Sequence, residues 1–223
     1  MVEQGTQSTQ GPQGPKMTPG TQSNQSTQSA RDLVVTGTGT ASGGDFDKVK
    51  VIGEGNVDGD LASTQVKVRG VINVHGHLKT GRMQVVGTAY VGGNLQGDEV
   101  AVTGTLQVTG DCSAEKLKVR GGFSVDGLLN AENLDIALYG PARAKEIGGG
   151  IINIRPRFRI FSHYKRLTVD TVEGDEVRLH YTSAKVVRGN KVYVGPGCEI
   201  ELVEYKDDFQ QAKSAKVTEH RRR

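Results

Sequence analysis

The sequence predicts an all-β protein, a parallel β-helix with triangular coils, and three observations lead to this prediction. A unit of 17 residues repeats five times without insertion, from Asp45 to Leu129. Within each unit apolar and polar residues alternate, which is the period of a strand with one buried face. Glycine occupies the ninth and fifteenth positions of every unit, where the chain can turn at little steric cost.

The valines show the repeat most clearly. They occupy the seventh and thirteenth positions of every unit: Val51, Val68, Val85, Val102 and Val119, then Val57, Val74, Val91, Val108 and Val125. Three short apolar pairs and three corners per unit predict one triangular coil of 17 residues. A single coil cannot bury its inward side chains, so stacking at a spacing of about 4.8 Å must supply both the core and the strand pairing.

The segment before the repeats has a different composition. Residues 1–31 consist mainly of Gln, Ser, Thr, Gly and Pro. Such a segment buries too little apolar surface to offset its ordering entropy, so we expect a disordered tail. Leu33 and Val35 match the fifth and seventh positions of the unit, which predicts an incomplete leading coil. The β-helical domain is therefore predicted over residues 32–147.

Beyond this domain the pattern weakens. Three consecutive glycines at 148–150 mark a predicted boundary. Residues 148–205 contain a fainter 15-residue period, in which Val177 recurs as Val192. We expect a smaller β-rich region that either caps the last coil or forms a short second β-stack. Residues 206–223 are polar and basic, which predicts a second disordered tail.

Composition restricts the function classes. The net charge of +3 gives no strong field for nucleic acid, and no nucleic-acid partner is expected. No run of 18 apolar residues occurs and the amino terminus lacks signal-peptide features, so we expect a cytoplasmic protein, with a peripheral position at the inner face of the membrane left open. Cys112 and Cys198 lack metal-site spacing and are predicted to be buried thiols.

Outward positions of the units collect cations on one face of the predicted helix. This basic face comprises Lys50, Lys67, Arg69, Arg82, Lys118 and Arg120. One interpretation is a solvated face that resists edge-to-edge aggregation. The other is attraction to an anionic polymer, a membrane surface or a partner protein.

Catalytic candidates are few. His75-Gly76-His77 places two histidines two residues apart on a strand, where they could share a metal. The equivalent positions hold Asp58 and Asp60 in the preceding unit, so the slot is interpreted as a polar corner with a variable occupant. No Ser-His-Asp set, paired-carboxylate cleft or phosphate loop is present. We therefore predict no enzyme activity, no cofactor and no metal.

The ladders Val49-Lys50-Val51-Ile52-Gly53 and Val57-Asp58-Gly59-Asp60-Leu61, with their successors, resemble those of the bactofilins, which are bacterial polymer-forming cytoskeletal proteins. Residues 173–200 are similar to the extended, two-part members of that family. The resemblance implies a right-handed β-helix that self-assembles end to end without nucleotide. It also implies filaments or sheets that scaffold envelope or cell-shape processes.

The expected function is therefore structural, with other copies of the chain as the main partner. Self-association is assigned to the terminal coils, at Leu33 and Val35 on one end and at Phe123, Val125, Leu134 and Ile136 on the other. Envelope-associated proteins or the membrane surface are further expected partners. The alternative is a capped, monomeric β-helix that presents its basic face to an anionic polymer, a membrane or a partner protein.

Overall fold

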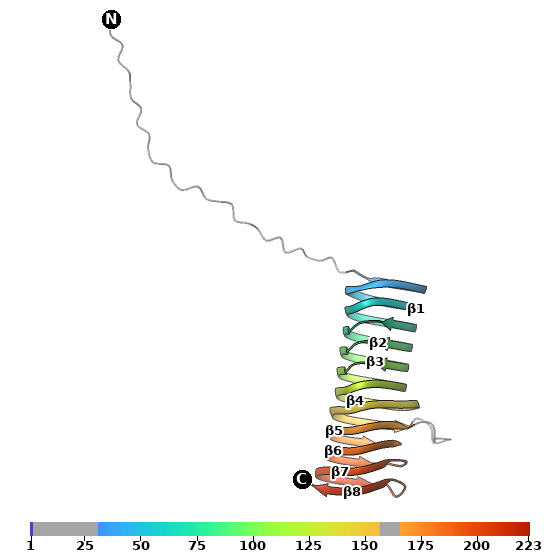
Figure 1. Ribbon diagram of the computed structural model, residues 1–223, viewed down its shortest axis with the longest axis vertical. Coiled ribbons are helices and arrows are strands. Elements are labelled where there is room, and N and C mark those ends of the chain that lie inside the picture. The colour runs from blue at the N-terminus through green and yellow to red at the C-terminus, as the bar shows by residue number, and fades with distance from the viewer. Residues whose placement is uncertain (2–30, 157–165) are drawn as a thin grey trace.

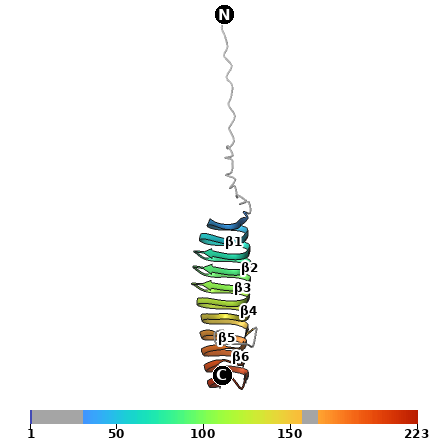
Figure 2. The ribbon, with the colours of Figure 1, turned by 90° about the vertical axis from the view of Figure 1, so that its right-hand side faces the viewer.

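The computed structural model describes residues 1, 31–156 and 166–223, which form one continuous parallel β-helix (Figure 1). Eight strands follow one another along a single sheet in chain order. They are β1 (Leu33–Val74), β2 (Leu78–Val91), β3 (Leu95–Val108), β4 (Cys112–Pro156), β5 (Leu167–Leu179), β6 (Thr182–Val194), β7 (Glu199–Gln211) and β8 (Lys216–Arg222). The side view shows the coils stacked as a narrow rod (Figure 2). The predicted fold class is confirmed.

Pairing between coils follows the predicted register. Val68 pairs with Val85, Val85 with Val102, and Val102 with Val119, so each strand meets its equivalent 17 residues later. The inward side chains of all the stacked coils form one continuous buried core. Aliphatic side chains at period two thus provide the core and the ladder together, because their backbones bond along the stack while their side chains point inward.

Two kinds of corner explain the repeated glycines. At the ninth position Gly87 has a φ of 132°, and a Cβ there would lie 2.0 Å from the carbonyl oxygen of Gly70. At the fifteenth position the constraint is space, since a Cβ on Gly110 would lie 2.0 Å from the side-chain oxygen of Asn94. Only glycine fits either place without movement of a neighbour.

The glycine run at 148–150 does not interrupt the helix. It lies inside β4, whose 45 residues wind through several coils and then pair with β5. Gly149 pairs with Gly174 and Gly174 with Gly189, so the corner continues across the predicted boundary. The shorter spacing is also present, because Val177 pairs with Val192. Of the two alternatives left open by the sequence, the carboxyl-terminal region extends the stack.

The prediction of a disordered basic tail over residues 206–223 is wrong. Strand β7 continues to Gln211, and β8 then pairs with β7 in parallel. Ala215 is buried and Val217 packs against the core. The basic side chains that suggested disorder have a buried carboxylate as their partner, described below, so ordering them is favourable. The predicted amino-terminal tail lies outside the described residues, apart from residues 1 and 31.

Candidate functional site

The amino-terminal end of the stack is the first candidate surface. Strand β1 lies at one edge of the sheet and has a neighbouring strand on one side only (Figure 1). The predicted self-association residues Leu33 and Val35 lie there, half-buried against the core, and Val34 between them is 62% exposed. The guanidinium of Arg31 lies 5.2 Å from the ring centroid of Phe46, over the adjacent coil. This end combines apolar side chains with an unpaired strand edge, a template for another strand.

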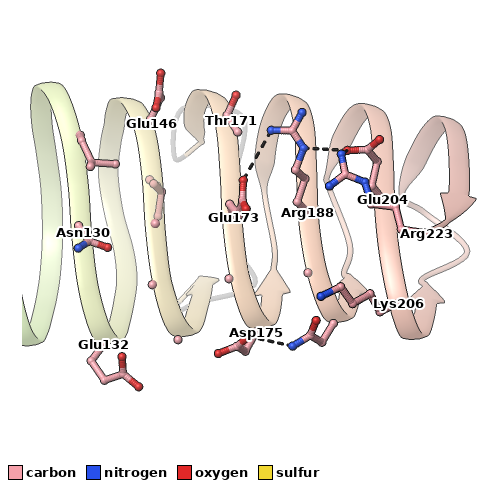
Figure 3. A pocket seen from close by; sticks show the side chains of 18 residues that line it. Asn130, Glu132, Glu146, Thr171, Glu173, Asp175, Arg188, Glu204, Lys206 and Arg223 are labelled. Carbon is pink, nitrogen blue, oxygen red and sulfur yellow. Dashed lines mark hydrogen bonds and ion pairs between the residues drawn. The ribbon is translucent and has the colours of Figure 1, made fainter.

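The carboxyl-terminal end is closed by a cluster of charges around Glu204. Its side chain is only 1% exposed. Arg188 donates from Nε to Oε2 at 2.7 Å, Arg221 donates from Nε to Oε1 at 2.9 Å, and Arg223 donates to Oε2. Figure 3 shows Arg188 placed between Glu173 and Glu204 on successive coils. One carboxylate therefore connects β6, β7 and the end of the chain after β8.

The arginines set the ionisation of this carboxyl group. The hydrogen bond from Arg188, followed by that from Arg221, lowers the pKa of Glu204 from 4.5 to about 2, against the opposing effect of burial. The same hydrogen bond raises the pKa of Arg188. Glu204 thus remains charged at neutral pH even though it is buried, because its oxygens are satisfied by charge-assisted hydrogen bonds.

An aromatic cluster covers the last coil beside these charges. The ring of Phe209 lies 5.4 Å from that of Tyr205 and 4.9 Å from that of His220. These distances are in the range of favourable ring packing. The cluster attaches β8 to β7 through side chains as well as backbone bonds. The carboxyl-terminal end therefore presents charged and aromatic groups where the amino-terminal end presents aliphatic ones.

Four of the predicted self-association residues do not lie at an end. Phe123, Val125, Leu134 and Ile136 are buried inside β4, in the middle of the stack. Coils lie on both sides of them, since β3 pairs with the start of β4 and β5 with its end. Their assignment to an open end is wrong, because the end of the clear sequence repeat is not the end of the helix.

All six residues of the predicted basic face are exposed, but the structure divides them. Arg82 forms an ion pair with Glu99 at 2.8 Å, and Lys118 lies 3.9 Å from Asp135. Among the described residues, the other four have no ion pair: Lys50, Lys67, Arg69 and Arg120. Lys50, Lys67 and Arg69 lie together on neighbouring coils beside one shallow groove.

The histidines belong to a ladder of backbone acceptors. Asp60 accepts a hydrogen bond from the backbone N–H of His77 at 2.7 Å, and Nδ1 of His77 accepts one from that of Asn94 at 2.9 Å. Asn94 and Asp111 accept from the next coils at 3.0 and 2.8 Å. His75 instead contacts Asp58 at 2.8 Å. This supports the interpretation as a polar corner, and the described residues contain no group of three potential metal ligands.

Sequence reasoning missed a polar groove of about 790 Å³ along one corner of the carboxyl-terminal coils (Figure 3). Its floor is the glycine column of Gly149, Gly174 and Gly189, which lacks side chains. Several wall residues bind one another: Arg188 lies 3.6 Å from Glu173, and Asn190 donates to Asp175 at 2.8 Å. The recurrence of glycine at the 15-residue spacing was the available signal.

Both cysteines are buried thiols, as predicted. Burial raises the pKa of Cys112 to about 12 and that of Cys198 to about 11. The thiolate is the reactive form, so neither is suited to nucleophilic chemistry.

Comparisons with known proteins give short but close similarities. The chain is 46% identical over 65 residues to the uncharacterized protein YhbF of Bacillus subtilis (strain 168). It is 53% identical over 51 residues to the uncharacterized protein YhbE of the same organism. These matches cover 29% and 23% of this chain, and only 28% and 22% of the relatives. No family model and no solved structure matches. No helix among the described residues is long and apolar enough to span a membrane.

Proposed function

We propose that this protein is a non-enzymatic structural protein whose copies assemble end to end into cytoskeletal polymers in the cytoplasm, as in the bactofilins that its repeats resemble. The observation that carries the proposal is the amino-terminal end, where an unpaired strand edge coincides with the apolar side chains of Leu33, Val34 and Val35. The polymer scaffolds envelope or cell-shape processes and meets envelope-associated proteins there.

The driving force is the one that stacks coils within the chain. A second copy at this end continues the backbone ladder of β1 and removes Leu33 and Val35 from water, at about 25 cal/mol per Å² of apolar surface. No nucleotide is required, because burial and strand pairing supply the free energy. The carboxyl-terminal end carries charged β8, so the amino-terminal end supplies the larger apolar share of the contact.

Electron microscopy and analytical ultracentrifugation over a range of concentrations test the proposal. Val35 is inward-facing but only half-buried at the edge, so Val35→Asp introduces a charge into the contact while leaving the central coils intact. We expect wild-type protein to form filaments or sheets and Val35→Asp to remain a single copy. Val86→Asp, the same change at a valine on the side of the rod, is the control and should still assemble.

Two results would contradict the proposal. One is wild-type protein that sediments as a single copy at every concentration, without filaments. The other is a Val35→Asp variant that assembles as readily as the Val86→Asp control.

A further inference from the structure

The amino-terminal half of the basic face has an uneven distribution of charge. Positions four, six and eight of three consecutive coils place nine outward side chains in a flat array: Lys48, Lys50, Ile52, Gln65, Lys67, Arg69, Arg82, Gln84 and Val86. Five of these nine are cations and none is a carboxylate. Along the stack neighbours lie about 4.8 Å apart, and across a strand about 6.6 Å. We call this array the amino-terminal basic patch.

Most of its charge is not neutralised within the described chain. Arg82 pairs with Glu99 at the border of the patch. Lys48, Lys50, Lys67 and Arg69 form no ion pair with another described residue. In the carboxyl-terminal half of the same face, by contrast, Arg155 contacts Asp135 at 3.0 Å and Lys191 contacts Glu176 at 3.4 Å. The uncompensated field is therefore concentrated on the amino-terminal coils.

The patch also exposes two large apolar side chains among these cations. Ile52 is 40% exposed and Val86 is 61% exposed, although both occupy outward positions that could hold polar residues. They border a shallow groove of about 360 Å³ together with Lys50, Lys67 and Arg69. Apolar side chains surrounded by lysine and arginine are the composition of surfaces that lie in the membrane interface.

We propose that the amino-terminal basic patch binds the surface of an anionic lipid bilayer. Lys50, Lys67 and Arg69 contact headgroup phosphates, while Ile52 and Val86 enter the boundary between headgroups and acyl chains. A flat, rigid array in two dimensions matches a two-dimensional array of headgroups. The rod then lies along the membrane on this face, and no spanning segment is needed.

Other anionic partners fit less well. A single-stranded nucleic acid is held by aromatic side chains that stack on its bases, and none of the nine positions is aromatic. An acidic peptide would use one row of cations, whereas the cations here are distributed over three columns and several coils. Neither partner accounts for the exposure of both Ile52 and Val86.

Vesicle co-sedimentation tests the proposal. Vesicles of phosphatidylcholine alone are compared with vesicles containing 30% phosphatidylglycerol, at about 0.1 M and 0.5 M salt, where screening lengths differ about twofold. The test variant is Lys50→Glu/Lys67→Glu/Arg69→Glu. The matched control is Lys79→Glu/Lys145→Glu/Lys213→Glu, which makes a similar charge change at three exposed lysines outside the patch.

The wild type should bind the anionic vesicles, bind the neutral ones weakly, and be partly released by salt. The patch variant should bind at least about 100-fold more weakly, since each basic residue near an anionic surface contributes roughly fivefold. The control should retain most of the binding. Ile52→Ser/Val86→Ser should bind normally at low salt and lose the salt-resistant fraction.

Three outcomes would overturn the proposal: no preference of the wild type for anionic vesicles, an equal loss in the control, or a stronger interaction with poly-glutamate or single-stranded DNA than with vesicles. Ile52→Ser/Val86→Ser binding like the wild type at high salt would overturn the insertion of the apolar side chains. The inference deepens the proposed function and depends on it only for the cytoplasmic location. Because binding is measured with Val35→Asp as well as wild-type protein, failure of vesicle binding and failure of assembly are distinguishable.

Discussion

Glu204 offers a quantitative test of what holds the last strand in place. Replacing it with glutamine keeps the shape of the side chain but removes the charge that Arg188, Arg221 and Arg223 share. A pKa lowered from 4.5 to about 2 corresponds to at most about 3.4 kcal/mol, from 2.5 units at 1.36 kcal/mol each. Arg221 and Arg223 are about half exposed, so solvent screening reduces the expected effect to about 1–2 kcal/mol.

Hydrogen–deuterium exchange at neutral pH measures this loss locally. In Glu204→Gln the backbone amides of β8 should exchange roughly 5 to 30 times faster, because 1.4 kcal/mol is a factor of ten in an equilibrium constant. The central strands β2 and β3 should be unaffected. Glu173→Gln is the control, since Glu173 also contacts Arg188 but is 65% exposed. If β8 exchanges at the wild-type rate in Glu204→Gln, or as fast in the control, the carboxylate does not hold the strand.

The same cluster predicts a dependence on pH with a definite sign. Because the pKa of Glu204 is lower in the folded state, its contribution is complete above the ordinary value of 4.5 and declines as the pH falls toward about 2. Wild-type β8 should therefore loosen in this acidic window. Glu204→Gln should lack that component, which supplies an internal check on the assignment.

Three further predictions concern the core and the corners. Val85→Asp buries an unpaired charge at a position that is 2% exposed, so circular dichroism should show loss of the folded state; a cooperative transition near the wild-type temperature would refute the inward assignment. Gly87→Ala should destabilise the protein by at least about 2 kcal/mol in urea unfolding, because its φ of 132° and the carbonyl of Gly70 both exclude a Cβ. Gly148→Ala, which faces only the end of the Asn130 side chain, should cost less, and equal losses would contradict this account. Cys112, with its pKa raised to about 12, should react with a thiol reagent only after unfolding, and rapid labelling of the folded protein would disprove its burial.

The repeat allowed the core to be predicted almost position by position. Val68, Val85 and Val102 recur at one spacing, and a spacing that never drifts has a single stacked solution, so their pairing follows directly. The corner glycines were equally predictable, because a backbone requirement repeated in every unit leaves the same residue in every unit.

The ends could not be predicted in the same way. Leu134 looked terminal because the clear repeat stops nearby, yet the strand continues and later coils cover it. The order of β8 depends on a carboxylate, Glu204, that becomes buried only when Arg221 folds over it. Such a pairing between two exposed-looking residues leaves no periodic signal, since it occurs once. Periodic patterns reveal the interior of a stack, while its ends depend on unique contacts.

The ladder of Asp60, His77, Asn94 and Asp111 has a consequence for the length of the rod. Each side chain binds the backbone of the following coil, and each coil offers the same bond in turn. Removal of one whole unit, residues 79–95, would therefore join two coils that already match and shorten the rod by about 4.8 Å. Length in this protein can change in whole units, by duplication or loss, while the chemistry of both ends remains the same.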